Sequence, residues 1–149
     1  MNPLHFQSLR EVESKQVPSE LQSGIPGEER FPEGVSFVVP TYNNEATLSA
    51  TLDSIVKQEF DGPRELLLVD DRSADGTRDV ANNYPFPEEW RFRCVENVYG
   101  GLAGGYNCGW QAAQYGTLVF MHADCFLPRT DSVLRTLDHF QDPDVVAVM

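Results

Sequence analysis

The sequence predicts an α/β domain with a mostly parallel sheet, of Rossmann-like type, and helices on both faces of that sheet. Apolar runs of four or five residues alternate with segments whose apolar residues recur at helical spacing. These runs are apolar throughout, as expected of parallel strands that are buried on both sides. With 149 residues, 41% of them hydrophobic, the chain is long enough for one such domain and its core.

The first half of the chain contains two strands, each followed by a helix. Residues 35–39 form a strand that is expected to end at Pro40, and residues 65–69 form the second strand. Residues 43–44 offer asparagine caps for a helix whose apolar residues are Leu48, Leu52, Ile55 and Val56. The second helix opens at residues 75–77 and is stopped by Pro85 and Pro87.

The second half repeats this alternation. A weaker strand at 92–95 leads to a glycine-rich stretch at 100–105, and a helix that ends near Gly116 follows it. A strand at 118–121, a helix marked by Leu134, Leu137 and Phe140, and a strand at 145–149 complete the chain. Because the chain ends in that strand, we expect an exposed sheet edge that favours self-association through strand pairing.

The first 33 residues have a different character. They contain scattered prolines and glycines and few apolar residues, which predicts a flexible N-terminal arm. The domain itself is expected at residues 34–149.

The net charge of −12 limits the ligands that the protein can take. It argues against nucleic acid, because binding would need a basic surface that displaces counterions from phosphates. The only lysines are Lys15 and Lys57, so an anionic ligand needs arginines, backbone amides or a bound cation to neutralise it.

The three cysteines, Cys94, Cys108 and Cys125, indicate a reducing compartment. Their number is odd, they show no CxxC spacing, and with the three histidines they form no zinc pattern, so we expect buried free thiols. The sequence also has neither a membrane-length apolar run nor a signal-peptide core, and we expect a cytoplasmic protein.

Two acidic stretches, residues 70–75 and 122–125, follow buried strands and are the main candidates for a site. Ligands of α/β sheets bind at the carboxyl ends of the strands, and carboxylates there suit Mg²⁺, Mn²⁺ or Ca²⁺. The alternative is that these acids are turn residues that cap helices.

Other nucleotide and phosphate motifs fit less well. The glycines at 100–109 never give the G-x-G-x-x-G spacing of a dinucleotide fingerprint, and no P-loop is present. A phosphoacceptor receiver site needs an acidic pair after the first strand and a lysine after a late strand, and both are missing. A phosphatase-like D-x-D nucleophile is disfavoured because His122 occupies the first position.

Four segments at strand ends, in order, do fit a known pattern. They are VVPTYNNE at 38–45, VDDRSADGT at 69–77, GLAGGYNCG at 101–109 and HADCFLP at 122–128. Together they resemble the nucleotide-sugar-binding half of family 2 glycosyltransferases, which have the GT-A fold. The resemblance extends over residues 35–149, about three quarters of the chain.

The resemblance implies roles for individual residues. Pro40, Tyr42 and Glu45 would line the nucleoside pocket, Asp71 would hydrogen-bond the base, most often uracil, and Asp70 would support that loop. Asp124 would hold Mn²⁺ or Mg²⁺ against the diphosphate of a nucleotide-diphospho-sugar. The remaining donor-binding positions implied are Gly104, Asn107, His122 and Ala123. These roles suit the residue types, since a carboxylate accepts base N–H groups and a tyrosine ring offers a face for stacking.

The sequence departs from the family pattern at two positions. His122 stands where the first acid of the D-x-D motif is usual, and its neutral imidazole could bond a ribose hydroxyl. Tyr106 stands where the glycine-rich segment often has an arginine.

The resemblance also leaves the catalytic residues open. Family members place the catalytic base and the acceptor site in a C-terminal half, so we expect both beyond residue 149. We therefore expect the donor-binding part, truncated before the acceptor half, of an inverting transferase for a UDP-sugar and an unknown acceptor. The alternative is a catalytically silent nucleotide-binding or protein-interaction module.

Overall fold

A computed structural model describes residues 34–59 and 61–149, so the predicted N-terminal arm lies outside the described residues. In this part, four strands form one parallel sheet in the order β3-β2-β1-β4. Their bounds are β1 Val35–Thr41, β2 Arg64–Asp70, β3 Trp90–Glu96 and β4 Thr117–Phe120. The first four predicted strands are thereby confirmed, with bounds that shift by one or two residues.

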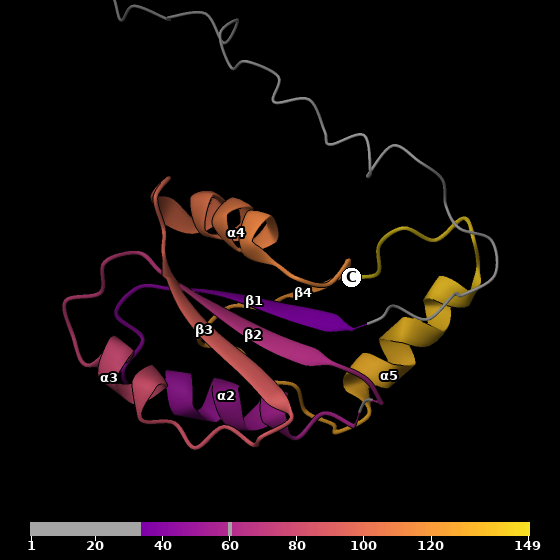
Figure 1. Ribbon diagram of the computed structural model, residues 1–149, viewed down its shortest axis with the longest axis horizontal. Helices are drawn as coiled ribbons and strands as arrows, with labels where there is room; N and C mark the ends of the chain where they lie inside the picture. The colour runs from indigo at the N-terminus through magenta and orange to yellow at the C-terminus, as the bar shows by residue number, and fades with distance from the viewer. Residues whose placement is uncertain (1–33, 60) are drawn as a thin grey trace, which may run out of the picture.

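Helices cover both faces of the sheet, which confirms the predicted α/β class (Figure 1). Helix α4, Gly101–Ala112, lies on one face. The other face carries α2, Leu48–Val56, α3, Thr77–Asn82, and α5, Ser132–Leu137, which continues into the 3₁₀ turn Asp138–Gln141.

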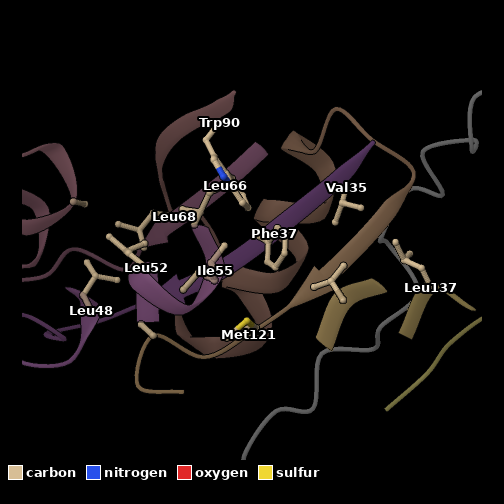
Figure 2. Close-up of a cluster of buried hydrophobic side chains, with 14 residues drawn as sticks. Val35, Phe37, Leu48, Leu52, Ile55, Leu66, Leu68, Trp90, Met121 and Leu137 are labelled. Carbon is tan, nitrogen blue, oxygen red and sulfur yellow. The ribbon is translucent and has the colours of Figure 1, made fainter. Parts of the chain in front are cut away.

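The side chains of the central strand β1 point alternately to the two faces of the sheet. Val35, Phe37 and Val39 belong to the larger buried cluster, between the sheet and helices α2 and α5, where Figure 2 shows Phe37 near Trp90 and Ile55. Val38 points to the other face and packs with Leu67 and Val69 against α4. Because both faces are covered, β1 is buried along its whole length and is mostly apolar, with Ser36 and Thr41 as its polar residues.

Strand β1 continues through Pro40 to Thr41, so the prediction that it ends at Pro40 is wrong. The Val38 carbonyl accepts the Met121 N–H on the β4 side, and the Thr41 carbonyl accepts the Asp71 N–H on the β2 side. Pro40 therefore turns its nitrogen towards β4, where the pairing has already ended at Phe120. A proline is tolerated there because no ladder hydrogen bond is lost.

Helix α4 begins within the glycine-rich stretch, at Gly101, and does not merely follow it. Its glycines allow close packing on β1. A Cβ atom at Gly109 would lie 2.2 Å from Cγ1 of Val38, and one at Gly105 would lie 2.8 Å from Cβ of Pro40. Glycine lowers the stability of a helix interior, but at these positions it allows a short distance between α4 and the sheet.

Two other predicted elements differ from the structure. Helix α2 begins at Leu48, later than the predicted asparagine cap, because the Asn44 side chain accepts the Tyr42 N–H at 2.9 Å and holds a turn instead. The predicted strand at 145–149 is wrong: these residues form no ladder within the described part, and Val146 is exposed. A strand requires a neighbour to satisfy its backbone groups. Self-association through this segment stays a prediction.

The three cysteines are free, and all lie in the described part of the chain. Cys94 and Cys125 are exposed, so the prediction that the thiols are buried is wrong for these two. Cys94 lies on the same face of the edge strand β3 as Trp90 and Phe92, but it is nearer the carboxyl end of the strand, where its side chain is exposed. Among the helices of the described residues, none has the length and apolarity needed to cross a membrane.

Candidate functional site

A pocket of about 170 Å³ opens at the carboxyl ends of the strands, where α/β sheets bind ligands. Its walls come from the end of β1 and the segment after it, the first residues after β2 and β3, the start of α4 and the turn after β4. The lining residues are Pro40, Thr41, Tyr42, Asn44, Asp71, Asn97, Gly101, Leu102, His122, Ala123 and Asp124. The structure thus brings together five predicted positions besides Asp124: Pro40, Tyr42, Asp71, His122 and Ala123.

Asp71 is half-buried and directly follows β2. Its N–H donates to the Thr41 carbonyl at 2.9 Å, which continues the sheet ladder into the loop. Its Oδ2 accepts the Gly101 N–H at 2.7 Å and so joins the loop to the start of α4. A carboxylate has about four acceptor positions. Asp71 can therefore hold α4 and still accept an N–H from a ligand in the pocket.

Asp70 is fully buried and does not line the pocket. Its Oδ2 accepts the Arg78 Nε–H at 2.5 Å, and both of its oxygens lie within 3.3 Å of the Ser73 nitrogen. The carboxylate thus ties the loop after β2 to helix α3. This arrangement is compatible with the supporting role predicted for Asp70.

Two aromatic side chains, Tyr42 and His122, line the pocket. Tyr42 is 61% exposed and offers its ring at the pocket. Tyr106 packs edge-on against Phe120, with ring centroids 5.1 Å apart, and against His122 at 6.0 Å. Burial raises the pKa of Tyr106, so its hydroxyl stays neutral at ordinary pH. Tyr106 therefore packs against the His122 ring as a neutral side chain and brings no phenolate charge to the site.

The turn after β4 places Asp124 at the rim of the pocket. The buried Ala123 contributes a carbonyl that accepts the hydroxyls of Thr47 at 3.1 Å and Thr51 at 2.9 Å. These bonds fix the turn to α2, while the Asp124 side chain stays exposed. Asp124 is thereby held on a rigid backbone with its carboxylate in solvent.

The donor set at this rim is compatible with a Mg²⁺ or Mn²⁺ ion that arrives with a phosphate ligand. Within the described residues, no group of three or more His, Cys, Asp or Glu side chains could hold a metal by itself. Mg²⁺ commonly takes one or two carboxylates and completes its shell with phosphate oxygens and water. Asp124 meets that requirement, because its carboxylate is exposed at the rim and the Cys125 thiol that contacts it at 3.7 Å is a weak donor.

Besides Asp70, three further predicted positions lie outside the pocket lining. Glu45 accepts the Gly76 N–H at 2.9 Å, next to α3. Gly104 is buried, and a Cβ there would lie 2.9 Å from Cβ of Tyr99, so it serves close packing. Asn107 is exposed on α4.

Sequence reasoning missed Thr41, Asn44, Asn97, Gly101 and Leu102 as lining residues. Asn97 is the most informative of them: it is buried, accepts the Gly100 N–H at 3.0 Å and donates to the Gly101 carbonyl at 2.8 Å. It follows β3 just as Asp71 follows β2. A polar residue at that strand end was the signal that could have revealed it.

Comparisons with solved structures agree with this architecture. The mannosyltransferase PcManGT from Pyrobaculum calidifontis, in complex with GDP-Man and Mn²⁺, superposes with a TM-score of 0.64 at 29% identity, over 76% of this chain and 34% of that one. Staphylococcus aureus TarS 1-349 in complex with UDP-GlcNAc gives a TM-score of 0.62 at 25% identity, over 74% and 31%. Both structural neighbours are GT-A glycosyltransferases.

Sequence comparisons find glycosyltransferases as well. The chain is 30% identical over 113 residues to the UDP-Glc:alpha-D-GlcNAc-diphosphoundecaprenol beta-1,3-glucosyltransferase WfaP of Escherichia coli, covering 75% of this chain and 43% of that protein. It is 25% identical over 134 residues to the poly-beta-1,6-N-acetyl-D-glucosamine synthase of Staphylococcus epidermidis, covering 90% and 32%. The chain thus spans less than half the length of these relatives.

The family model described as Glycosyl transferase family 2 matches residues 36–149, the same part of the chain that folds into the sheet and its helices. With the parallel sheet and the strand-end pocket, this match shows that the chain belongs to glycosyl transferase family 2.

Proposed function

We propose that this chain is the donor-binding part of an inverting glycosyltransferase that uses a UDP-sugar together with Mn²⁺ or Mg²⁺. The observation that carries the proposal is that one pocket is lined by both Asp71, which can accept a base N–H, and Asp124, whose carboxylate is exposed at the rim. The pocket is smaller than the roughly 300–1,000 Å³ of most small-molecule sites. Its size suits the nucleoside, with the diphosphate and sugar towards the rim.

In this proposal the uracil base lies between Tyr42 and Asp71. The exposed Tyr42 ring provides a face for stacking, and the Asp71 carboxylate accepts the base N–H. Support comes from the relatives: the WfaP protein is named for UDP-Glc, and TarS was solved with UDP-GlcNAc. The complex of PcManGT with GDP-Man makes a guanine nucleotide the natural competitor in a binding assay.

The diphosphate would meet an acidic protein, with a net charge of −12. A divalent ion held by Asp124 would neutralise it, and when bound it would stabilise the negative charge that develops on the departing nucleotide. The presence of Mn²⁺ in the PcManGT structure supports this assignment. His122 would contribute a hydrogen bond to a ribose hydroxyl from the same turn.

We assign deprotonation of the acceptor hydroxyl to a carboxylate outside these 149 residues. The support is the length of the relatives, since this chain spans about a third of the poly-beta-1,6-N-acetyl-D-glucosamine synthase and of PcManGT. Attack by the activated hydroxyl from the face opposite the diphosphate would invert the anomeric centre.

Calorimetric titration of UDP, with and without Mn²⁺, tests the proposal. We expect UDP and Mn²⁺ to tighten each other's binding by the same factor, as linkage requires. Asp124→Ala should abolish this coupling and leave metal-free UDP binding nearly unchanged. Asp138→Ala, an acid on the 3₁₀ turn after α5, is the matched control and should behave like the unmutated chain.

Asp71→Asn tests the nucleoside half of the site. The amide can still accept the Gly101 N–H but presents an NH₂ group where a second oxygen was, so UDP affinity should fall by about 1–3 kcal/mol. GDP should bind more weakly than UDP to the unmutated chain. If UDP affinity does not depend on Mn²⁺, the metal assignment is wrong, and if neither nucleotide binds, the chain is the silent interaction module.

A further inference from the structure

The two loops that carry Tyr42 and Asp71 are locked together by reciprocal hydrogen bonds. We call residues 42–45 and 71–77 the loop clasp. The Asn43 N–H donates to the Ser73 hydroxyl at 2.9 Å, and the Asn43 side-chain oxygen accepts the Ala74 N–H at 2.8 Å. Each loop thus satisfies backbone groups of the other.

Glu45 and Asp75 contribute a second pair of hydrogen bonds between the same two loops. The Glu45 N–H donates to the Asp75 carboxylate at 3.1 Å, and the Gly76 N–H donates to the Glu45 carboxylate at 2.9 Å. The Glu45 carboxylate therefore accepts a backbone donor just before helix α3, where negative charge is favourable. These are the contacts through which Glu45 acts on the loop that begins at Asp71.

The loop clasp holds two strained residues, and each is adjacent to a pocket residue. Asn43, next to Tyr42, has a φ of 54°, and Arg72, next to Asp71, has a φ of 62°. Left-handed backbone at residues other than glycine costs free energy and persists only where the surroundings fix it. The conformations that present Tyr42 and Asp71 to the pocket therefore depend on the hydrogen bonds of the clasp.

The space around Gly76 is independent evidence that the position of Glu45 matters. Gly76 has a φ of −75°, which any residue can adopt, so its backbone does not require glycine. A Cβ atom there would, however, lie 2.7 Å from the carboxylate carbon and Oε1 of Glu45. The absence of a side chain at Gly76 is what lets the Glu45 carboxylate approach its N–H.

We propose that Glu45 is a positioning residue for nucleotide recognition: it does not touch the nucleotide but fixes, through Gly76, the loop that presents Asp71. This inference deepens the proposed function and rests on it. It replaces the role in lining the nucleoside pocket that the family resemblance implied. The specificity of the site for a nucleoside is then set partly by a contact outside the pocket.

The test compares UDP affinity in Glu45→Ala, Glu45→Gln, Gly76→Ala and the double variant Glu45→Ala/Gly76→Ala. Glu45→Ala should weaken UDP binding about tenfold, whereas Glu45→Gln, which keeps an oxygen acceptor for the Gly76 N–H, should stay within about threefold. Gly76→Ala should match Glu45→Ala, and the double variant should bind no more weakly than either single variant. The matched control is Glu59→Ala, which removes a carboxylate that bonds Thr130 in another loop.

A second readout follows amide hydrogen exchange without nucleotide. In Glu45→Ala the amides of Ala74 and Gly76 should exchange faster, while those of β1 and β2 keep their protection. The inference is overturned if Glu45→Ala binds UDP like Glu59→Ala, or if the two single effects multiply in the double variant, because Glu45 would then touch the nucleotide directly. Unchanged exchange at Gly76 would also overturn it.

The same design separates the inference from the proposed function. If the unmutated chain does not bind UDP, the proposed function fails, and the exchange measurements still decide whether Glu45 fixes the loop. If Glu45→Ala does not fold, Gly76→Ala, which keeps the carboxylate but displaces it, decides between the outcomes.

Discussion

Strand β2 carries a fully buried carboxylate near each of its ends, Glu65 and Asp70, and the two act on different parts of the molecule. Each pairs with an arginine that solvent reaches: the Arg93 side chain is 34% exposed and that of Arg78 is 48% exposed. Glu65 lies at the end of the sheet away from the pocket. Asp70 lies at the pocket end, beside Asp71.

The partners of the two carboxylates explain the difference. Glu65 accepts the Ser36 hydroxyl at 2.7 Å and the Gln114 N–H at 2.5 Å, so it fixes the chain where it returns from α4 to β4. Asp70 fixes α3 and the loop that begins at Asp71. Similar chemistry thus stabilises the fold at one end of the strand and the binding loop at the other.

Glu65→Ala should give the largest effect, a loss of about 4 kcal/mol in the free energy of unfolding. The change leaves the Ser36 hydroxyl and the Gln114 N–H without their buried acceptor and removes the carboxylate that pairs with Arg93. Denaturant unfolding measures the loss. UDP affinity of the folded protein should stay as it was, and a parallel loss of affinity would break the comparison between the two ends.

Asp70→Ala should cost less stability, about 3 kcal/mol, because the half-exposed Arg78 side chain can turn to water. Unlike the change at Glu65, it should also weaken UDP binding by about 1–2 kcal/mol, since the loop that presents Asp71 loses its anchor. Unfolding and titration on the same preparation provide the measurement. If UDP affinity is unchanged, the loop is held by the clasp alone.

Replacing each of two glycines in α4 by alanine tests the same contrast between the pocket end of the sheet and its other end. Gly109→Ala should destabilise by about 1–3 kcal/mol through overpacking on Val38 and leave UDP affinity unchanged. Gly105→Ala should destabilise by a similar or smaller amount, but it presses on Pro40, which lines the pocket, and should also weaken UDP binding. Thermal melts and titrations of both variants provide the test. Equal affinities would mean that the pocket tolerates a displaced Pro40.

The smallest expected effect is on the stability of the fold at acid pH, and it involves the exposed carboxylate of Asp75. A hydrogen bond from the Thr77 hydroxyl holds the pKa of Asp75 below its ordinary value, against a smaller opposing effect of desolvation. A lowered native pKa stabilises the fold above the unfolded-state pKa, near about 4, and this contribution is lost as the pH falls through the native value.

Asp75→Asn should therefore lower the melting temperature slightly at neutral pH, and the difference from the unmutated chain should shrink below about pH 4. Melting curves across the acid range measure this difference, with Asp138→Asn as the control. If the difference in melting temperature stays the same in acid, Asp75→Asn destabilises the fold because the amide does not fit the hydrogen-bond geometry, and not because it lacks a negative charge.

Much of the fold could be predicted because its signals are local. The apolar runs predicted β1 to β4 to within two residues, since a strand buried on both faces has few polar positions. The glycines of α4 predict a later start for this helix because glycine has a poor helix propensity, and their use is explained by tertiary contacts, such as those of Gly105 with Pro40 and of Gly109 with Val38. The apolar residues 145–149 suggested a strand, but strand formation depends on a partner that the local sequence does not reveal.

The site was predictable where a residue follows a strand. Asp71, His122 and Asp124 line the pocket because strand ends define its position. Glu45 and Gly104 have contacts that depend on tertiary approach, to Gly76 in one case and to Tyr99 in the other, and no pattern in the local sequence indicates these. Asn97 went unnoticed because β3 is half-polar on its exposed side, which weakened the strand signal before it.

The pairing of β1 with its two neighbours also indicates the order in which the strands are expected to join the sheet during folding. Ser36 meets Glu65 of β2 across 29 positions of the chain, whereas the contact between Ser36 and Tyr115, just before β4, spans 79 positions. Closing the longer loop costs more chain entropy, and non-local contacts form slowly, so β4 is expected to join last. Because His122 and Asp124 follow β4, the pocket is complete only after that step. A fluorescent nucleotide added to the refolding chain would then report the final event of folding, not the initial collapse.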